Sequence, residues 1–245
     1  YNKLKVSSKK SYIENILDSN KFHYNDDIQK SYKKTDKSEW HMNPQTVNAY
    51  YNPPLNEMVF PAAIFNEPFF YEKNIAKSYG GIGAVIGHEI THGFDDQGSK
   101  YDKDGNFNDW WTKEDRIKFT ERTQKIVKQY DSYSFHNTQV NGSLTQGESI
   151  ADLGGLTVAY HAYQKYMTDN NITSVNYKNE KQLFYNFANV WRNKRTKESL
   201  INQITTDPHP PAILRVNATV SNMPEFYKIF NIKKGDKLYR DEKDR

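Results

Sequence analysis

The sequence contains no cysteine, no long hydrophobic run and no long basic run. The absence of cysteine excludes a disulfide framework. Because no stretch of about 18 apolar residues occurs, we predict that no segment of this chain crosses a membrane. The net charge is only +4 and the lysines are spread along the chain, which argues against nucleic-acid binding. No charged-then-apolar leader follows Tyr1, so we expect any targeting segment to lie outside this sequence.

The composition is that of a folded protein with a core of its own. Hydrophobic residues make up 36% and aromatic residues 14% of 245 residues, a length that suits one large domain or two small ones. Residues 1–43 are polar and lysine-rich, with weak helical periodicity near residues 12–17 and 24–32. We therefore predict two helices in residues 1–43 and assign residues 44–245 to a second, larger domain.

The most informative stretch is an H-E-x-x-H motif, His88-Glu89-Ile90-Thr91-His92. We predict a helix over residues 74–96 that ends near Gly93. In such a helix, His88 and His92 lie on one face with Cβ atoms about 5–6 Å apart. One metal ion can then bind a nitrogen of each ring at about 2.0–2.1 Å. Glu89 points about a quarter-turn away, where it can act as general base on a metal-bound water without being a ligand.

A third ligand is needed, and a helix predicted over residues 146–168 offers two carboxylates. The metzincin pattern, which ends in a further histidine, is excluded because Asp95 and Gly98 occupy the relevant positions. Glu148 and Asp152 are four residues apart and share a helix face. One carboxylate can bind the metal while the other accepts a hydrogen bond from a ligating histidine and fixes its tautomer.

We favour one zinc ion per chain, held by His88, His92 and Glu148, with Asp152 as the supporting carboxylate. Asp95 or Asp96 is a candidate for orienting His92, with helix capping or a surface role as the alternative. Small residues on both helices, including Gly87, Gly154 and Gly155, predict that the two helices pack closely.

Three other regions complete this interpretation. Residues 46–65 read as two short strands around Asn52–Asn56, and an edge strand beside a metal can hold an extended peptide by its backbone. A further helix is predicted over residues 180–192. Prolines around His209 exclude a helix over residues 207–211 and stiffen the backbone there.

The two motifs around His88 and Glu148 resemble those of the neprilysin family of zinc metallopeptidases, which includes the endothelin-converting enzymes and bacterial oligopeptidase O. The resemblance spans almost the whole chain. Further matches, in chain order, are Val47–Tyr51, Val59–Ala62, Tyr79–Gly83, Asp104–Gly105, Asp109–Trp111 and Asp207–His209 followed by Arg215.

This resemblance implies a thermolysin-like catalytic lobe, an α+β fold that is mostly α with a small sheet. It implies that Asn48 and Ala49 bind the substrate main chain, through the asparagine amide and the alanine carbonyl. It implies that His209 donates a hydrogen bond to the transition state and that Arg215 binds a substrate carbonyl or carboxylate. The expected reaction is hydrolysis of short peptides on the amino side of hydrophobic residues.

The resemblance also implies a helical lid region upstream of Tyr1, to which residues 1–43 would connect. Animal members are disulfide-bonded ectoenzymes, so the lack of cysteine favours the bacterial branch and a cytoplasmic location, with a secreted or cell-surface location left open.

Two other functional classes stay open on the sequence alone. A catalytically inactive zinc-binding module for adhesion or regulation is disfavoured because it would not need Glu89. A zinc hydrolase of a non-peptide substrate is disfavoured by the expected edge strand at Asn48 and Ala49.

Overall fold

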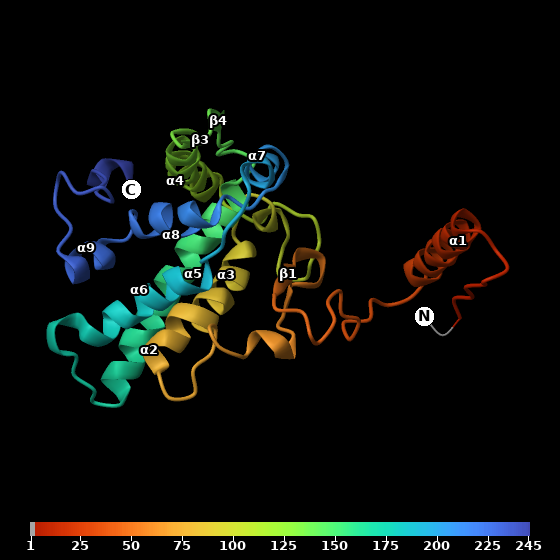
Figure 1. The fold of residues 1–245 in the computed structure, drawn as a ribbon, viewed down its shortest axis with the longest axis horizontal. Coiled ribbons are helices and arrows are strands. Elements are labelled where there is room, and N and C mark those ends of the chain that lie inside the picture. Colours follow the sequence, from red (N-terminus) through yellow and green to blue (C-terminus); the bar gives the residue numbers. More distant parts are fainter. Residues whose placement is uncertain (1–2) are drawn as a thin grey trace. The chain divides into compact units, whose positions relative to one another are not determined.

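Helices dominate the computed structural model, which describes residues 3–245 (Figure 1). The helices are α1 (Tyr12–Ser31), α2 (Ile75–Ser78), α3 (Ala84–His92), α4 (Lys113–Asp131), α5 (Gln146–Asp169), α6 (Lys178–Val190), α7 (Lys197–Thr206), α8 (Ala212–Val220) and α9 (Pro224–Phe230). The strands form two antiparallel pairs, β1 (Tyr50–Asn52) with β2 (Glu57–Val59) and β3 (Ser134–Phe135) with β4 (Thr138–Gln139). The predicted class, mostly α with a small sheet, is confirmed. Within residues 3–245, no helix combines the length and apolar character that crossing a membrane requires.

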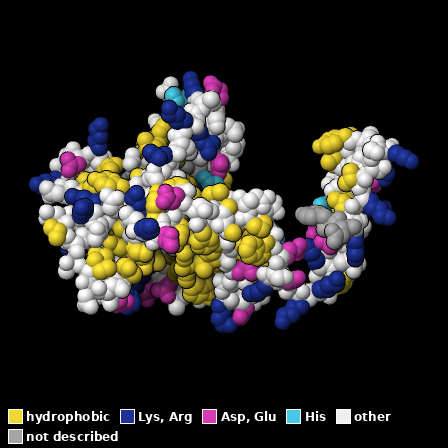
Figure 2. Space-filling view, turned by 60° about the horizontal axis from the view of Figure 1, so that its bottom comes forward, with side chains coloured by type: hydrophobic (Ala, Val, Ile, Leu, Met, Phe, Trp, Pro, Cys, Tyr) yellow, Lys and Arg dark blue, Asp and Glu magenta, His cyan; other side chains and the backbone are white. Residues whose placement is uncertain are grey.

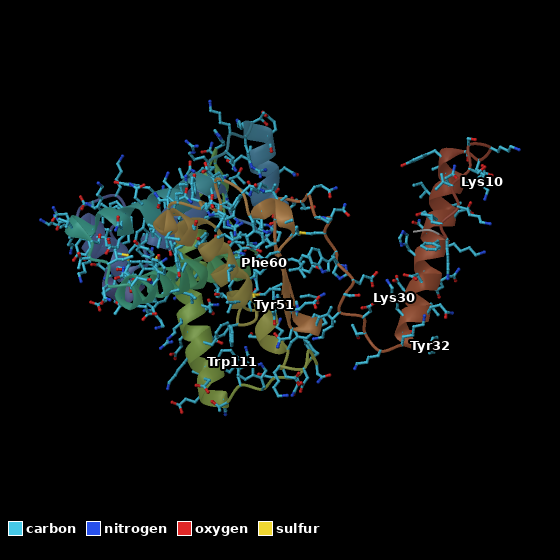
Figure 3. All side chains as sticks on the ribbon, turned by 90° about the horizontal axis from the view of Figure 1, so that it is seen from below. Lys10, Lys30, Tyr32, Tyr51, Phe60 and Trp111 are labelled. Carbon is cyan, nitrogen blue, oxygen red and sulfur yellow. The ribbon has the colours of Figure 1, made fainter. Side chains whose placement is uncertain are left out.

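The chain divides after His41 into two units. In the first unit, the prediction of two helices is wrong, because α1 is one continuous helix without a buried residue. No glycine or proline interrupts it, and Ile13, Leu17, Tyr24 and Ile28 follow one another at helical spacing along a single stripe. Ser11 and Glu14 form a capping box at its start. Lys10 and Lys30 lie near its two ends (Figure 3).

The second unit is built around α3 and α5, which lie side by side (Figure 1). Gly87 and Gly155 allow this close approach, since a Cβ added to Gly87 would lie 2.5 Å from the carbonyl oxygen of Gly155. The predicted close packing of the two helices is confirmed. The main core combines side chains of α5, α6 and α9, among them Leu156, Ala159, Tyr163, Leu183, Phe184, Phe187, Phe226 and Ile229.

We expect Gly155→Ala to destabilise the fold. Its Cβ would lie 2.5 Å from the His88 nitrogen and 2.8 Å from the Ala84 oxygen, both backbone atoms that cannot rotate away. Overpacking of this kind costs about 1–3 kcal/mol, which exceeds the roughly 1 kcal/mol that alanine gains over glycine in a helix. Thermal unfolding should show a Tm lower by several degrees.

The matched control is Gly83→Ala, where the backbone is also helical and the nearest atom is 3.4 Å away. We expect this variant to be as stable as the wild type or more so. Equal Tm values for the two variants would contradict the close-packing argument.

The predicted hairpin and motif helix are present, with details that periodicity does not encode. Tyr50 pairs with Val59, and Asn56 closes the turn in the left-handed region at φ 45° and ψ 55°. The segment predicted as one helix over residues 74–96 consists of α2, a π-helical stretch over Tyr79–Gly83, and α3, which ends at His92. Helices α7, α8 and α9 were not predicted, because they are short, α8 directly follows the proline-rich segment around His209, and α9 begins at a proline.

Candidate metal centre and active site

Three side chains from two helices converge at one point. His88 and His92 on α3 place their Nε2 atoms 2.9 Å apart. Glu148 on α5 places its carboxylate oxygens 3.3 Å from Nε2 of His88 and 3.6 Å from Nε2 of His92. Donors in a tetrahedral zinc site with bonds of about 2.0–2.1 Å lie roughly 3.3–3.4 Å apart. The donor set therefore fits one zinc ion.

A carboxylate holds the far nitrogen of each histidine. Nδ1 of His88 lies 2.9 Å from Oδ1 of Asp152, and Nδ1 of His92 lies 2.7 Å from Oδ2 of Asp95. Each ring can therefore carry its proton on Nδ1 and present Nε2 to a metal. Of the two candidates left open for His92, the structure places Asp95 in contact, whereas Asp96 bonds the side chain of Gln97.

Arg215 contacts the carboxylates of Asp152 and Glu148, both on α5. Its Nε and Nη2 each lie 2.7 Å from Asp152, and Nη2 lies 3.1 Å from Glu148. The guanidinium stacks 3.9 Å from the centre of the Trp191 ring, and Arg215 is only 6% exposed. Arg215 therefore neutralises the buried carboxylates of Asp152 and Glu148, a role that the sequence did not predict. Trp191 packs against the core and also stacks on the Arg215 guanidinium.

These neighbours shift the protonation of the site. Burial opposes a charge on His88, but its hydrogen bonds to Asp152 and Glu148 outweigh burial and raise the pKa of the imidazole to about 9. Burial favours the neutral form of Glu148, but His209, His88 and Arg215 together hold the pKa of that carboxyl well below its usual range. Metal binding requires a neutral imidazole, so His88 would have to release this proton to hold a zinc ion.

Glu89 lies beside the donor set, close enough to interact electrostatically with His88, His92 and Glu148. It is 5% exposed, and burial raises the pKa of its carboxyl. A carboxylate with a raised pKa is a stronger base than one in water, which suits proton transfer near neutral pH.

His209 reaches the same place from the proline-rich segment between α7 and α8. Its Nδ1 lies 2.7 Å from Asp207 and its Nε2 lies 3.2 Å from Glu148. The side chain of Gln203 donates a hydrogen bond to the backbone oxygen of His209 at 3.1 Å and so holds the segment. Asp207 was not predicted as a site residue, although it stands only two positions before His209.

All of the predicted site residues line one cavity of about 500 Å³. Asn48 is exposed and Ala49 buried, directly before β1. The cavity residues predicted from the sequence are Asn48, Ala49, His88, Glu89, His92, Glu148, Asp152, His209 and Arg215.

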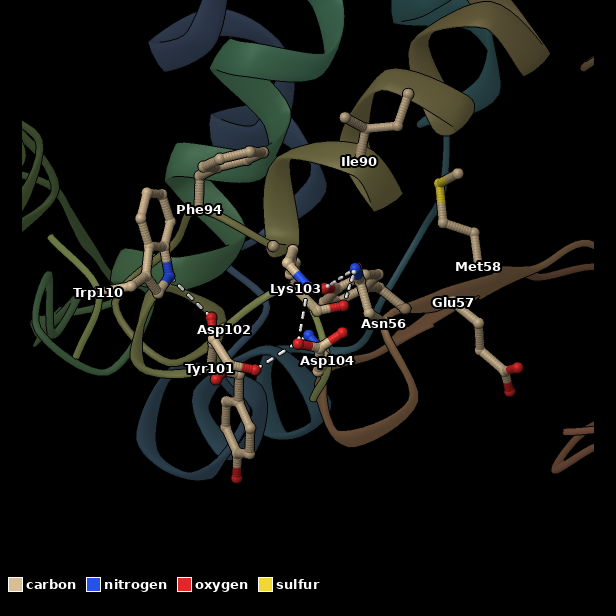
Figure 4. A pocket seen from close by; sticks show the side chains of 12 residues that line it. Asn56, Glu57, Met58, Ile90, Phe94, Tyr101, Asp102, Lys103, Asp104 and Trp110 are labelled. Atoms are coloured by element: carbon tan, nitrogen blue, oxygen red, sulfur yellow. Dashed lines mark hydrogen bonds and ion pairs between the residues drawn. The ribbon is translucent and has the colours of Figure 1, made fainter. Parts of the chain in front are cut away.

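A second cavity of about 610 Å³ shares Tyr51 with the first (Figure 4). Its wall includes the turn over residues 102–106, where Asp102 accepts hydrogen bonds from the backbone nitrogens of Asp104 at 2.9 Å and Asn106 at 3.0 Å. Because these backbone N–H groups bond the carboxylate of Asp102, the segment forms a tight turn. The apolar lining residues include Met58, Ile90, Phe94 and Trp110.

A mostly helical fold with a His–His–Glu donor set fits the class of zinc metallopeptidases. The sequence profile described as peptidase family M13 matches residues 48–245, and the chain belongs to that family. Among curated proteins, it is 41% identical to neprilysin-3 of Drosophila melanogaster over 240 residues, which cover 95% of this chain and 30% of that protein. It is 42% identical to human endothelin-converting enzyme-like 1 over 231 residues, which cover 92% of this chain and 30% of that protein.

Solved structures of zinc metallopeptidases resemble this chain closely. The chain superimposes on the zinc metalloprotease Zmp1 of Mycobacterium tuberculosis, in complex with an inhibitor, with a TM-score of 0.91 and 42% identity over 100% of this chain and 38% of that one. The TM-score with PepO of Lactobacillus rhamnosis is 0.79 at 35% identity, over 86% of this chain and 32% of that one. The chain thus spans about a third of the length of the relatives it matches.

Proposed function

We propose that this chain is the catalytic part of a zinc-dependent endopeptidase that cleaves short peptides on the amino side of hydrophobic residues. The observation that carries the proposal is the convergence of His88, His92 and Glu148 beside the buried Glu89. Membership of family M13 supports the reaction class, and the peptide preference rests on the resemblance to the neprilysin family.

In the proposed mechanism, His88, His92 and Glu148 hold the zinc ion. When bound, zinc acts as a Lewis acid that lowers the pKa of water and polarises the scissile carbonyl. Glu89 takes the proton of the attacking water on its carboxylate and delivers it to the leaving nitrogen. Asp152 and Asp95 keep the two imidazoles in the tautomer that presents Nε2.

Substrate contacts come from both sides of the cavity. Asn48 and Ala49 precede β1 and bind the extended peptide through an amide side chain and a backbone carbonyl. His209, held at Nδ1 by Asp207, donates from Nε2 to the developing oxyanion, a contact worth about 3–4 kcal/mol in comparable enzymes.

We expect substrate binding and thermal stability to fall stepwise when Arg215 is replaced by lysine and then by alanine. Lysine keeps the charge but cannot form two parallel bonds to Asp152 or stack flat on Trp191. Alanine leaves buried Asp152 without its cation, which costs about 3–5 kcal/mol in comparable buried pairs. KM should rise and the Tm should fall in the order Arg, Lys, Ala, measured by steady-state kinetics and thermal unfolding. Identical kinetics for arginine, lysine and alanine at position 215 would show that Arg215 has no role in catalysis or substrate binding.

Metal analysis together with mass-spectrometric digestion of a mixed peptide library tests the function. The expected result is one zinc per chain and cleavage before hydrophobic residues. Zinc without any hydrolysis would favour the inactive binding module, and hydrolysis of esters but not peptides would favour a non-peptide substrate.

We also propose that further parts of a longer polypeptide cover this unit, including a lid over the cavity. The relatives have about three times the matched length. Hydrophobic side chains gather on one face of residues 42–245 (Figure 2), and Ile86 and Ile90 of α3 are 36% and 41% exposed. Exposed apolar areas of this kind are typical of interaction surfaces. Equal kcat/KM values for residues 1–245 and for the natural polypeptide, on a short peptide and on unfolded casein, would contradict this proposal.

A further inference from the structure

A basic loop connects α6 and α7 close to the candidate active site. Arg192, Lys194 and Arg195 lie in this loop, and Lys197 begins α7. All four side chains are exposed, and none has a carboxylate within 4 Å among the described residues 3–245. The cations of the loop thus have no ion pair among the described residues, and Arg195 lies close enough to Asp207 to interact with its carboxylate electrostatically.

A cavity of about 390 Å³ opens against this loop. Two cations of the loop, Arg192 and Arg195, line this cavity. Its lining residues include no aspartate and no glutamate. The rest of the lining is uncharged. Apolar walls come from Phe135, Leu200, Ile213 and Val216, and amides come from Asn193, Gln203 and Asn217. An apolar cavity with guanidinium groups and amides suits a small organic group that ends in a carboxylate.

This cavity adjoins the candidate active site. Trp191 lines both cavities, and its ring carries Arg215 on one face. Gln203, another lining residue, donates hydrogen bonds to the backbone oxygens of His209 and Pro210. The two cavities therefore share Trp191 as a wall, and Gln203 ties the second cavity to the segment that carries His209.

We propose that Arg192 and Arg195 form an accessory subsite that binds a carboxylate of the peptide substrate. This inference rests on the proposed peptidase function and adds a preference for acidic peptides to it. The carboxylate comes from an aspartate or glutamate side chain or from the peptide's C-terminus. Arginine suits either source, because its planar guanidinium forms two parallel bonds to a carboxylate. Lys194 and Lys197 add attraction without a fixed geometry.

The test uses the natural polypeptide, the variants Arg192→Glu and Arg195→Glu, and matched peptides that differ only in charge. One series replaces each glutamate by glutamine, and another amidates the C-terminus. The wild type should prefer the charged peptide by about five- to tenfold in kcat/KM, through KM, and both variants should lose or reverse that preference. The arm that abolishes the preference identifies the source of the carboxylate. Arg122→Glu, an equal charge change at an exposed position on α4, should keep the preference.

A binding measurement separates this inference from the proposed function. The Glu89→Gln variant should bind the charged peptide about five- to tenfold more tightly than the neutral one, and adding Arg195→Glu should abolish the difference. If this binding preference is present but no peptide is hydrolysed by the wild type, the proposed function fails and the subsite stands. Equal binding of charged and neutral peptides, or a preference that survives both arginine variants, overturns the subsite. An equal loss of preference in Arg122→Glu also overturns it, because long-range charge would then explain the effect.

Discussion

Glu89→Gln should lower kcat by about 10²–10⁴-fold while leaving one zinc ion per chain, since general-base catalysis typically contributes that much. Glutamine has the same shape as glutamate but cannot take up the proton of the attacking water. The carboxylate of Glu89 is buried in the cavity but is not part of the donor set of His88, His92 and Glu148. The variant should therefore separate catalysis from metal binding, which kinetics and metal analysis on the same sample can show.

A surface variant provides the control for this experiment. Glu121→Gln makes the same chemical change at an exposed position on α4 and should leave both kcat and zinc content unchanged. Retention of a tenth or more of the wild-type kcat in Glu89→Gln would remove Glu89 as the base. Loss of zinc from Glu89→Gln would show instead that Glu89 contributes to the metal site.

The second large effect is expected at the third ligand. Glu148→Ala should weaken zinc binding by far more than 100-fold and abolish hydrolysis, because two imidazoles alone do not make a closed donor set. Competition against a chromophoric chelator measures the zinc affinity directly. A full equivalent of zinc bound to Glu148→Ala at sub-micromolar free metal would show that the ligand assignment is wrong.

Asp95→Asn is the matched comparison, because it changes a supporting carboxylate instead of a ligand. Asp95 accepts from His92 through Oδ2 and from two backbone N–H groups through Oδ1. Asparagine can keep the backbone contacts but presents an N–H group to His92, which opposes the required tautomer. We expect zinc affinity to fall about 10–100-fold. A loss as large as that of Glu148→Ala would mean that Asp95 does more than orient the ring.

Asp152 is the less suitable position for this comparison. It is 2% exposed and carries both His88 and Arg215. Its removal would leave a buried guanidinium without its main partner, so unfolding would accompany any loss of metal. The pairing with Arg215 therefore predicts a larger effect at Asp152 than the loss of a supporting carboxylate alone.

The errors in the sequence interpretation have physical causes. Weak periodicity near residues 12–17 and 24–32 looked like two helices, yet the apolar positions lie in phase with each other and nothing between them breaks a helix. Helices α7 and α8 were missed because proline and threonine surround them and their apolar stripes are short. The stacking of Arg215 on Trp191 was not predicted, since helical spacing shows which face is apolar but not which cation stacks on it.

The sequence by itself determined that His88 and His92 can share a metal ion with Glu89 beside it, because spacing within one helix is a local property of the backbone. It also determined the close approach of α3 and α5, since the glycines that permit it are visible in the chain. Only the tertiary structure decided that Asp95 and not Asp96 supports His92, that Arg215 pairs with Asp152 and Glu148, and that residues of α7 and α8 form a cavity with the basic loop. The Arg215 contacts and the cavity join elements far apart in the chain and depend on how the helices pack. The choice of Asp95 depends on the turn that follows α3, whose conformation no pattern of residues encodes.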